Sequence, residues 1–239
     1  MSEFNSAQSI GEIVSIMPKA SEVYKKFNID FCCEGHRPLS EAIKELGLNE
    51  SEVLRKLDEA YEETKRLTDQ VDFRNMSSSD MIDYIISKHH AFLKRNMPEV
   101  SELATTILRV HGANHNELFS VHKLFHTLKA ELDQHMIKEE ELLFPLIKEY
   151  ENKPSKELLG KISKVMKETE DEHETAGGVL KELRKVTDQY KIPDDVCGTF
   201  RKTYEMLQEV EADLFQHIHL ENNILFRRMC IQANGDVTM

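Results

Sequence analysis

The sequence predicts an all-α protein in which a small helical region is followed by four long helices. Strand patterns are nearly absent, because no segment alternates apolar and polar residues over a sustained stretch rich in Val, Ile and Thr. Apolar residues instead recur three and four positions apart, which is the spacing of helices packed on helices. Breaks at Gly112, Pro154 and Pro193 separate the long periodic segments.

The first region, residues 1–66, has the pattern of several short helices. Ser9 with Glu12 and Asn49 with Glu52 have the spacing of helix-capping pairs. A region this small buries little core by itself, so we expect it to dock on a partner or on a second copy of the chain, as a homodimer would allow. Residues 67–78 are polar and are expected to form a linker.

The second region, residues 79–239, is expected to form a four-helix bundle. The breaks divide it into four periodic segments, at 79–109, 116–150, 155–189 and 194–232.

Composition excludes several classes of function. The formal net charge is −12, which argues against nucleic acid and anionic membrane surfaces as partners. No apolar run approaches the roughly 20 residues of a membrane span. The polar start, Met1 to Gln8, lacks the pattern of a signal peptide. A cytoplasmic location is therefore expected, and there the four cysteines would stay mostly reduced.

The most informative feature is an internal repeat. The segments His135 to Phe144 and His217 to Phe226 both read H-x3-E-x2-[L/I]-L-F, and His90 and His173 recur at nearly the same offset. The region therefore reads as two copies of one helical hairpin. Each copy has a His on its first helix and a His-x3-Glu on its second. Antiparallel packing of the two hairpins would bring six such side chains to one level of a bundle. They are His90, His135, Glu139, His173, His217 and Glu221.

Helical phase places these polar residues among apolar ones. At about 100° per residue, Leu128, Leu132, Leu142 and Glu139 all lie on the His135 face of their helix. Buried carboxylates are costly unless they are paired or bind metal, so a pair of metal ions is expected. Imidazole and carboxylate ligands without thiolate favour iron, then manganese or zinc. Glu139 and Glu221 would each bridge both ions.

The other histidines differ in their expected roles. Phase favours His89 over His90 on the first helix, whereas the repeat offset favours His90. His122 and His126 lie on the far side of their helix and are expected to face solvent, and His219 lies on the side of its helix away from His217. Three residues are expected to support the ligands. They are Glu131, which faces the seam, Glu172, next to His173, and His111, near a helix junction, which could alternatively serve as a cap.

These motifs resemble the repair-of-iron-centres family, di-iron hemerythrin-like proteins with an N-terminal Cys-Cys domain. The resemblance covers nearly the whole chain. It rests on Ile29 to Cys33, Lys88-His89-His90, Val110 to His115, His135 to Glu140, Glu172-His173-Glu174 and His217 to Phe226. The family pattern implies His90 rather than His89 as a ligand, together with the other five residues of the repeat. The usual Cys-Cys-Gly-Gly is here Cys32-Cys33-Glu34-Gly35, and Arg227 stands where proline is common.

The resemblance implies a hemerythrin-like bundle that repairs iron–sulfur clusters damaged by nitric oxide or oxidants. Two non-haem, carboxylate-bridged iron ions would be held, and donation of iron to iron–sulfur client proteins is the first expectation. Reduction of NO at the same centre is the linked alternative, which would make the protein an enzyme.

Two other classes are weaker rivals. An oxygen carrier or an oxygen or NO sensor of the hemerythrin type would need a His and a carboxylate where Gly177 and Asn222 stand. A ferritin-type oxidase would need a second Glu-x-x-His besides Glu170 to His173, and the repeat offset does not supply one.

The pair Cys32-Cys33 allows three interpretations. The two thiols are reduced residues at the boundary of the small domain, or they form a strained vicinal disulfide that acts as a redox switch. In the third, they contact a client protein or bind iron transiently, at a site shared across a dimer rather than a closed one.

Overall fold

The computed structural model describes residues 3–64, 73 and 75–235. Every regular element among them is a helix, and one isolated bridge joins Ser9 to Pro38. The predicted all-α class is therefore confirmed. Within the described part of the chain, no helix combines the length and apolar character needed to cross a membrane. The chain divides into two compact units, 1–81 with 215–239, and 82–214.

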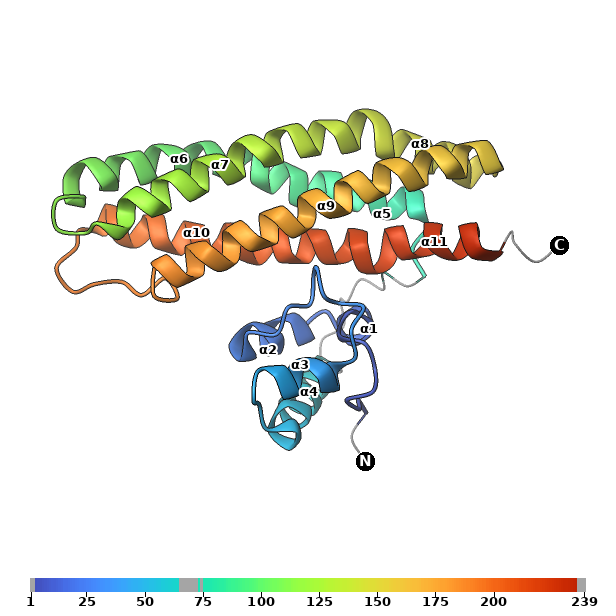
Figure 1. Cartoon of the computed structure of the whole chain (residues 1–239), viewed down its shortest axis with the longest axis horizontal. Helices are drawn as coiled ribbons and strands as arrows, with labels where there is room; N and C mark the ends of the chain where they lie inside the picture. Colours follow the sequence, from blue (N-terminus) through green and yellow to red (C-terminus); the bar gives the residue numbers. More distant parts are fainter. Residues whose placement is uncertain (1–2, 65–72, 74, 236–239) are drawn as a thin grey trace. The chain divides into compact units, whose positions relative to one another are not determined.

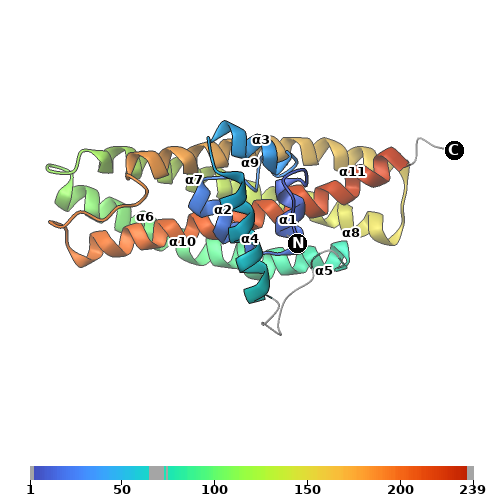
Figure 2. The same ribbon diagram turned by 90° about the horizontal axis from the view of Figure 1, so that it is seen from below.

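The unit 82–214 contains a four-helix bundle. Its helices are α6 (Ala91–His111), α7 (Glu117–Lys138), α9 (Lys156–Val186) and α10 (Gly198–Leu220), of which α10 continues beyond the unit. They run side by side in both views (Figures 1 and 2). Residues three and four apart on each helix fill the core, which includes Leu93, Val100, Val121, Phe125, Leu128, Ile162, Leu180, Phe200 and Leu207.

Three long helical segments of this region each contain one π-helical turn. The turn η1 (Ile86–His90) joins α5 (Ser78–Ile85) to α6, and η2 (Glu139–Leu143) joins α7 to α8 (Phe144–Asn152). The turn η3 (Glu221–Leu225) joins α10 to α11 (Phe226–Gly235). A π turn adds a residue to the helical repeat and rotates the face that follows it.

That rotation makes one expectation about the core wrong. A uniform α-helix would have put Leu142 on the His135 face, but Leu142 is 45% exposed and Leu143 is fully buried. The extra residue of η2 shifts the apolar face by one position, or about 100°. On the segment from α7 through α8, a spacing of 100° per residue therefore predicts the buried face only as far as Glu139.

The four short helices of the other unit are α1 (Ile10–Ile16), α2 (Ala20–Phe27), α3 (Leu39–Glu45) and α4 (Glu50–Thr64). Ser9 Oγ and Asn49 Oδ1 accept the backbone N–H groups of Glu12 and Glu52, as the capping pairs predict. Helix α2 packs on α4, and α1 packs on η3 in the same unit. Of the predicted linker 67–78, residues 67–72 and 74 lie outside the described residues.

Candidate metal centre

The three π turns lie where the sequence repeat places its polar residues. His90 is the last residue of η1, while Glu139 and Glu221 are the first residues of η2 and η3. π turns inside α-helices are frequent at functional sites in proteins. His173 lies on the regular helix α9. The two His-x3-Glu segments of the repeat therefore match in backbone geometry as well as in residue type, whereas His90 and His173 match in residue type alone.

Glu139 lies between histidines from neighbouring helices. Its Oε2 is 3.3 Å from His90 Nε2 and 3.2 Å from His135 Nε2, and its Oε1 is 4.0 Å from His173 Nε2. The Nε2 atoms of His135 and His173 are 3.1 Å apart. Between 0% and 4% of each of these four residues is exposed. One carboxylate and three imidazoles thus converge in a dry space.

His217 and Glu221 form the matching pair one helical turn apart. His217 Nε2 is 3.0 Å from Glu221 Oε1, and both residues are fully buried. Potential ligand atoms gather in two groups, each within 4.8 Å. One consists of His90, Glu139, His217 and Glu221, and the other of His135, Glu139, His173 and Glu221. Both groups share the same two carboxylates, as a carboxylate-bridged pair of metal ions requires.

The hydrogen-bond partners of two histidines show that this donor set fits a cation. His135 Nδ1 is 2.9 Å from Glu172 Oε2, and His90 Nδ1 is 2.6 Å from Glu140 Oε1. A carboxylate partner holds the proton on Nδ1, which leaves a lone pair on Nε2. These lone pairs face Glu139 oxygens and, at His135, another Nε2. Lone pairs directed at one another repel unless a cation lies between them, so the geometry suits metal ions.

Lysines hold the two outer carboxylates in their charged form. Glu172 also accepts from Lys138 Nζ at 2.7 Å. The hydrogen bond from His135, opposed by partial burial and aided by Lys138, lowers the pKa of Glu172 to about 2. Partial burial acts to raise the pKa of Glu140, but hydrogen bonds from Lys94 and His90 hold it below its ordinary value. Charged carboxylates in these positions orient the rings and increase their basicity.

The structure separates His89 from His90. His90 faces Glu139, whereas His89 Nδ1 lies 3.0 Å from Asp213 Oδ1 on α10. Helical phase alone had favoured His89, because it assumes an α-helix through η1. The geometry favours His90, in agreement with the repeat.

Two of the expected supporting residues lie elsewhere. Glu131 is exposed on α7 rather than buried in the seam. The Nε2 atom of His111 is 3.2 Å from Cys197 Sγ, at the end of α6. That end is about 30 Å along the helix from His90 at 1.5 Å per residue. Of the three, only Glu172 contacts a histidine of the two groups.

The expectation that His122 and His126 face solvent is wrong, and His219, expected on the side of its helix away from His217, is buried. His219 is 1% exposed, with its ring against Phe31. His122 and His126 stack with ring centroids 4.0 Å apart, and their Nε2 atoms contact Thr105 and Ser101 on α6. Both rings are therefore half-buried between two helices. Helical phase locates the bundle core but not the side contacts between neighbouring helices.

Sequence reasoning missed Glu140 and Asp213. Glu140 lies about 140° from the His135 face of a regular α-helix, and only the π turn brings it to His90. Asp213 lies one turn before His217, as Glu131 lies one turn before His135 in the other copy of the repeat, but the repeat gave no sign that Asp213 pairs with His89.

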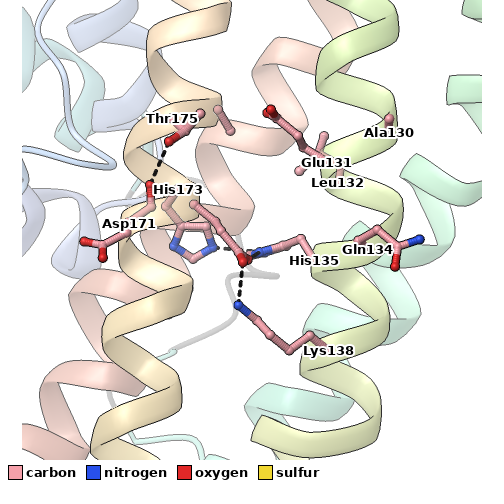
Figure 3. A pocket seen from close by; sticks show the side chains of 11 residues that line it. Ala130, Glu131, Leu132, Gln134, His135, Lys138, Asp171, His173 and Thr175 are labelled. Carbon is pink, nitrogen blue, oxygen red and sulfur yellow. Dashed lines mark hydrogen bonds and ion pairs between the residues drawn. The ribbon is translucent and has the colours of Figure 1, made fainter.

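A cavity of about 690 Å³ lies between α7 and α9 and reaches one of the two groups. Its wall includes His135 and His173 together with Lys138, Asp171 and Glu172, and Figure 3 shows Glu131 on the same wall. Three carboxylates and one ammonium give this wall a negative balance. The pair His90 and His217, both 0% exposed, belongs to the other group. The two groups therefore differ in their access to solvent.

Comparison with known proteins agrees with this architecture. The family model described as the hemerythrin HHE cation binding domain matches residues 81–229. Residues 6–61 match ScdA_N, a domain of unknown function. The bundle and its two buried groups thus define a hemerythrin-type cation-binding protein.

Relatives with both regions carry a more specific name. The iron-sulfur cluster repair protein YtfE of Enterobacter sp. (strain 638) is 35% identical over 226 residues, covering 92% of this chain and 96% of the relative. The probable iron-sulfur cluster repair protein of Haemophilus influenzae is 31% identical over 225 residues, which cover 93% of this chain and 96% of the relative. The iron-sulfur cluster repair protein ScdA of Staphylococcus haemolyticus is 29% identical over 219 residues, which cover 92% of this chain and 96% of the relative. The chain belongs to this family of iron–sulfur cluster repair proteins.

Proposed function

We propose that this protein repairs damaged iron–sulfur clusters by donating iron from a carboxylate-bridged pair of iron ions. The ligands would be His90, His217, His135 and His173, with Glu139 and Glu221 shared between the ions. The donor set supports iron, since imidazole and carboxylate without thiolate suit non-haem iron. When bound, the pair of ions supplies redox chemistry and a store of transferable iron.

The observation that carries the donation proposal is the unequal access to the two groups. His135 and His173 line the cavity between α7 and α9, whereas His90 and His217 are enclosed. Iron held on the cavity side can leave without the bundle unfolding. Imidazole and carboxylate ligands hold iron less firmly than the thiolates of a cluster, so transfer to an iron-depleted cluster is favoured.

Residues on the cavity wall would assist departure of the ion. Glu172 holds His135 through Nδ1 and faces the cavity, with Lys138 on its other oxygen. Glu131 and Asp171 lie on the same wall and offer carboxylates along the way out. A negative wall attracts a divalent cation and repels anionic chelators. Glu172 thus links the ligand His135 to the exit.

The test follows isotopically labelled iron from this protein to an iron–sulfur protein whose [4Fe–4S] cluster has lost an iron. The wild-type protein is expected to restore cluster absorption and to transfer labelled iron. Glu172→Gln is expected to lower the amount of labelled iron held, and with it the iron transferred per chain, by about 10-fold or more, because partners that orient ligands change metal affinity by about 10- to 100-fold. Glu168→Gln, on the exposed surface of the same helix, is the control. Labelled iron that never enters the cluster would rule out donation.

Reduction of NO is the second candidate for the same centre. It is favoured by the cavity, which is large enough to admit a diatomic gas as far as His135 and His173. Anaerobic protein supplied with NO and a reductant would form nitrous oxide if this reaction occurs. An absence of nitrous oxide, with cluster repair intact, would leave donation as the activity.

A further inference from the structure

Asn223 ties the Cys32-Cys33 loop to the turn that carries Glu221. It lies on η3, two residues after Glu221, and all of these residues belong to one unit of the structure. Its Nδ2 donates to the carbonyl oxygens of Cys32, at 3.0 Å, and Phe31, at 3.3 Å. The loop that holds the two thiols is therefore hydrogen-bonded to the turn of a shared carboxylate.

Two glycines make room for this side chain. A Cβ atom at Gly11 would lie 2.6 Å from Asn223 Oδ1, and one at Gly35 would lie 2.3 Å from it. The Gly11 N–H donates to the Gly35 carbonyl at 2.7 Å, which joins α1 to the cysteine loop beside Asn223. Any larger residue at position 35 would displace the amide from its two carbonyl acceptors. The amide thus occupies a fitted space.

The two thiols are arranged for oxidation to a disulfide. Their sulfurs are 3.5 Å apart, Cys32 is buried, and Cys33 is partly exposed. Asp30 Oδ1 accepts the N–H groups of Cys32 and Cys33 and also lies 3.3 Å from Cys32 Sγ. The neighbouring Cys33 sulfur, burial and the Asp30 carboxylate together raise the pKa of the Cys32 thiol well above its ordinary value.

These contacts favour oxidation over metal binding at the same three residues. Asp30, Cys32 and Cys33 place potential ligand atoms within 4.8 Å of one another. A closed metal site would need both sulfurs of two adjacent residues to bind one ion, and neighbouring side chains rarely chelate one metal ion well. Oxidation removes the thiol proton together with electrons and leaves a neutral disulfide. It therefore avoids placing a second negative charge there.

A vicinal disulfide would act directly on the acceptor of Asn223. The bond closes an eight-membered ring that contains the Cys32-Cys33 peptide. Consecutive Cα atoms are 3.8 Å apart, which is shorter than the usual separation in disulfides. The ring must therefore twist that peptide. Its carbonyl is the Cys32 oxygen that accepts from Asn223 at 3.0 Å, so the hydrogen bond cannot keep its present geometry.

We propose that Asn223 is a positioning residue through which the redox state of Cys32-Cys33 sets the position of Glu221. In the dithiol state the amide holds η3 and the loop together. In the disulfide state the hydrogen bond to the Cys32 carbonyl is lost and only the longer one to Phe31 remains, so the Glu221 carboxylate is less firmly placed and iron is held less tightly. This inference rests on the proposed two-iron centre and adds a control on when iron is released.

The oxidant belongs to the class of small disulfides such as oxidised glutathione. The Cys33 thiolate attacks one sulfur of the reagent, which releases one thiolate and leaves a mixed disulfide on Cys33. The Cys32 sulfur then attacks the Cys33 sulfur and gives its proton to Asp30 Oδ1. The second reagent thiolate leaves. Two protein thiols become one disulfide, and the reagent is reduced to two thiols.

The experiment uses the full chain with Cys197→Ser and Cys230→Ser, so that only one thiol pair can oxidise. Iron-loaded protein is compared before and after treatment with oxidised glutathione, and mass spectrometry verifies the disulfide. The measured quantity is the rate of iron release to a ferrous chelator. Oxidation is expected to speed release roughly 2- to 10-fold, the range for one hydrogen bond. In Asn223→Ala the ratio of oxidised to reduced rates is expected to fall to about 1.

Two further variants separate this coupling from general loss of structure. Gly35→Ala should displace the Asn223 amide and give the same ratio of oxidised to reduced release rates as Asn223→Ala. The double variant should give that same ratio. Asn222→Ala, on the same turn, should keep the wild-type ratio. The idea is overturned if Asn223→Ala retains that ratio, or if the disulfide forms in the wild type with no change in release. A pair that resists oxidation and binds zinc through Cys32 would also overturn it.

A readout without iron separates this idea from the proposed function. Hydrogen exchange of the η3 amides in zinc-loaded protein should increase on oxidation in the wild type but not in Asn223→Ala. That result with no cluster repair would retain the coupling and reject donation. Cluster repair by a protein whose η3 hydrogen exchange does not change on oxidation would retain donation and reject the coupling.

Discussion

Glu139→Gln is expected to stabilise the metal-free protein and to destabilise the iron-loaded one. Glu139 is fully buried, and its Oε2 lies 3.3 and 3.2 Å from Nε2 of His90 and His135. Both rings are orientated with a lone pair toward it, through Glu140 and Glu172. Gln has nearly the same volume, removes the charge, and supplies N–H donors to those lone pairs.

The sizes of the two effects follow from this geometry. Without metal, replacing a buried charged group by a neutral one is expected to add about 1–3 kcal/mol to the free energy of unfolding. For a chain of this length that raises Tm by about 2–12 °C. With iron, the variant lacks a carboxylate that both groups share. Each ion that is no longer bound removes about 2.7 kcal/mol of stabilisation at a free concentration of 100 Kd.

Calorimetry of the anaerobic protein, with and without a chelator, and metal analysis of the same samples test this expectation. The iron content of Glu139→Gln should fall below two per chain. Glu141→Gln, on the exposed side of the same π turn, is the control and should match the wild type. Two irons per chain in Glu139→Gln, or a metal-free variant less stable than the metal-free wild type, would refute the reasoning.

Three other outcomes are expected. Removing iron with a chelator should lower Tm while the helical circular dichroism is largely retained, because the packed apolar core does not depend on metal; complete loss of helix would contradict this. Hydrogen bonds from His111 and from the Phe200 backbone N–H lower the pKa of Cys197 to about 7. Alkylation of Cys197 should therefore rise with pH around a midpoint near 7, and His111→Ala should move that midpoint upward toward 9. An unchanged midpoint would show that the imidazole has no effect. Arg184→Ala leaves Glu211, which is 5% exposed, without its guanidinium partner. The free energy of unfolding, measured by urea titration, should fall by about 3–5 kcal/mol. A loss below 1 kcal/mol would show that the hydrogen bond from Tyr190 to Glu211 is enough to stabilise the buried carboxylate.

Local sequence patterns were enough to predict the fold class and the composition of the buried groups. The three- and four-residue apolar spacing predicts packed helices, and the structure confirms them. The two H-x3-E segments place His135 with Glu139, and His217 with Glu221, one turn apart on one face, which follows from helix geometry alone. The repeat offset also identified His90 and His173 as the matching residues. These inferences need only local periodicity.

The residues that support those groups, by contrast, depend on contacts between helices. Glu140 reaches His90, and Leu143 replaces Leu142 in the core, because η2 departs from 100° per residue. A π turn is poorly favoured by local propensity, and contacts between helices must compensate for it, so no local pattern reveals it. The same holds for Asn223, which reaches a carbonyl 191 residues away in the chain. Residue spacing determines what a helix presents, but packing between distant segments determines what each side chain touches.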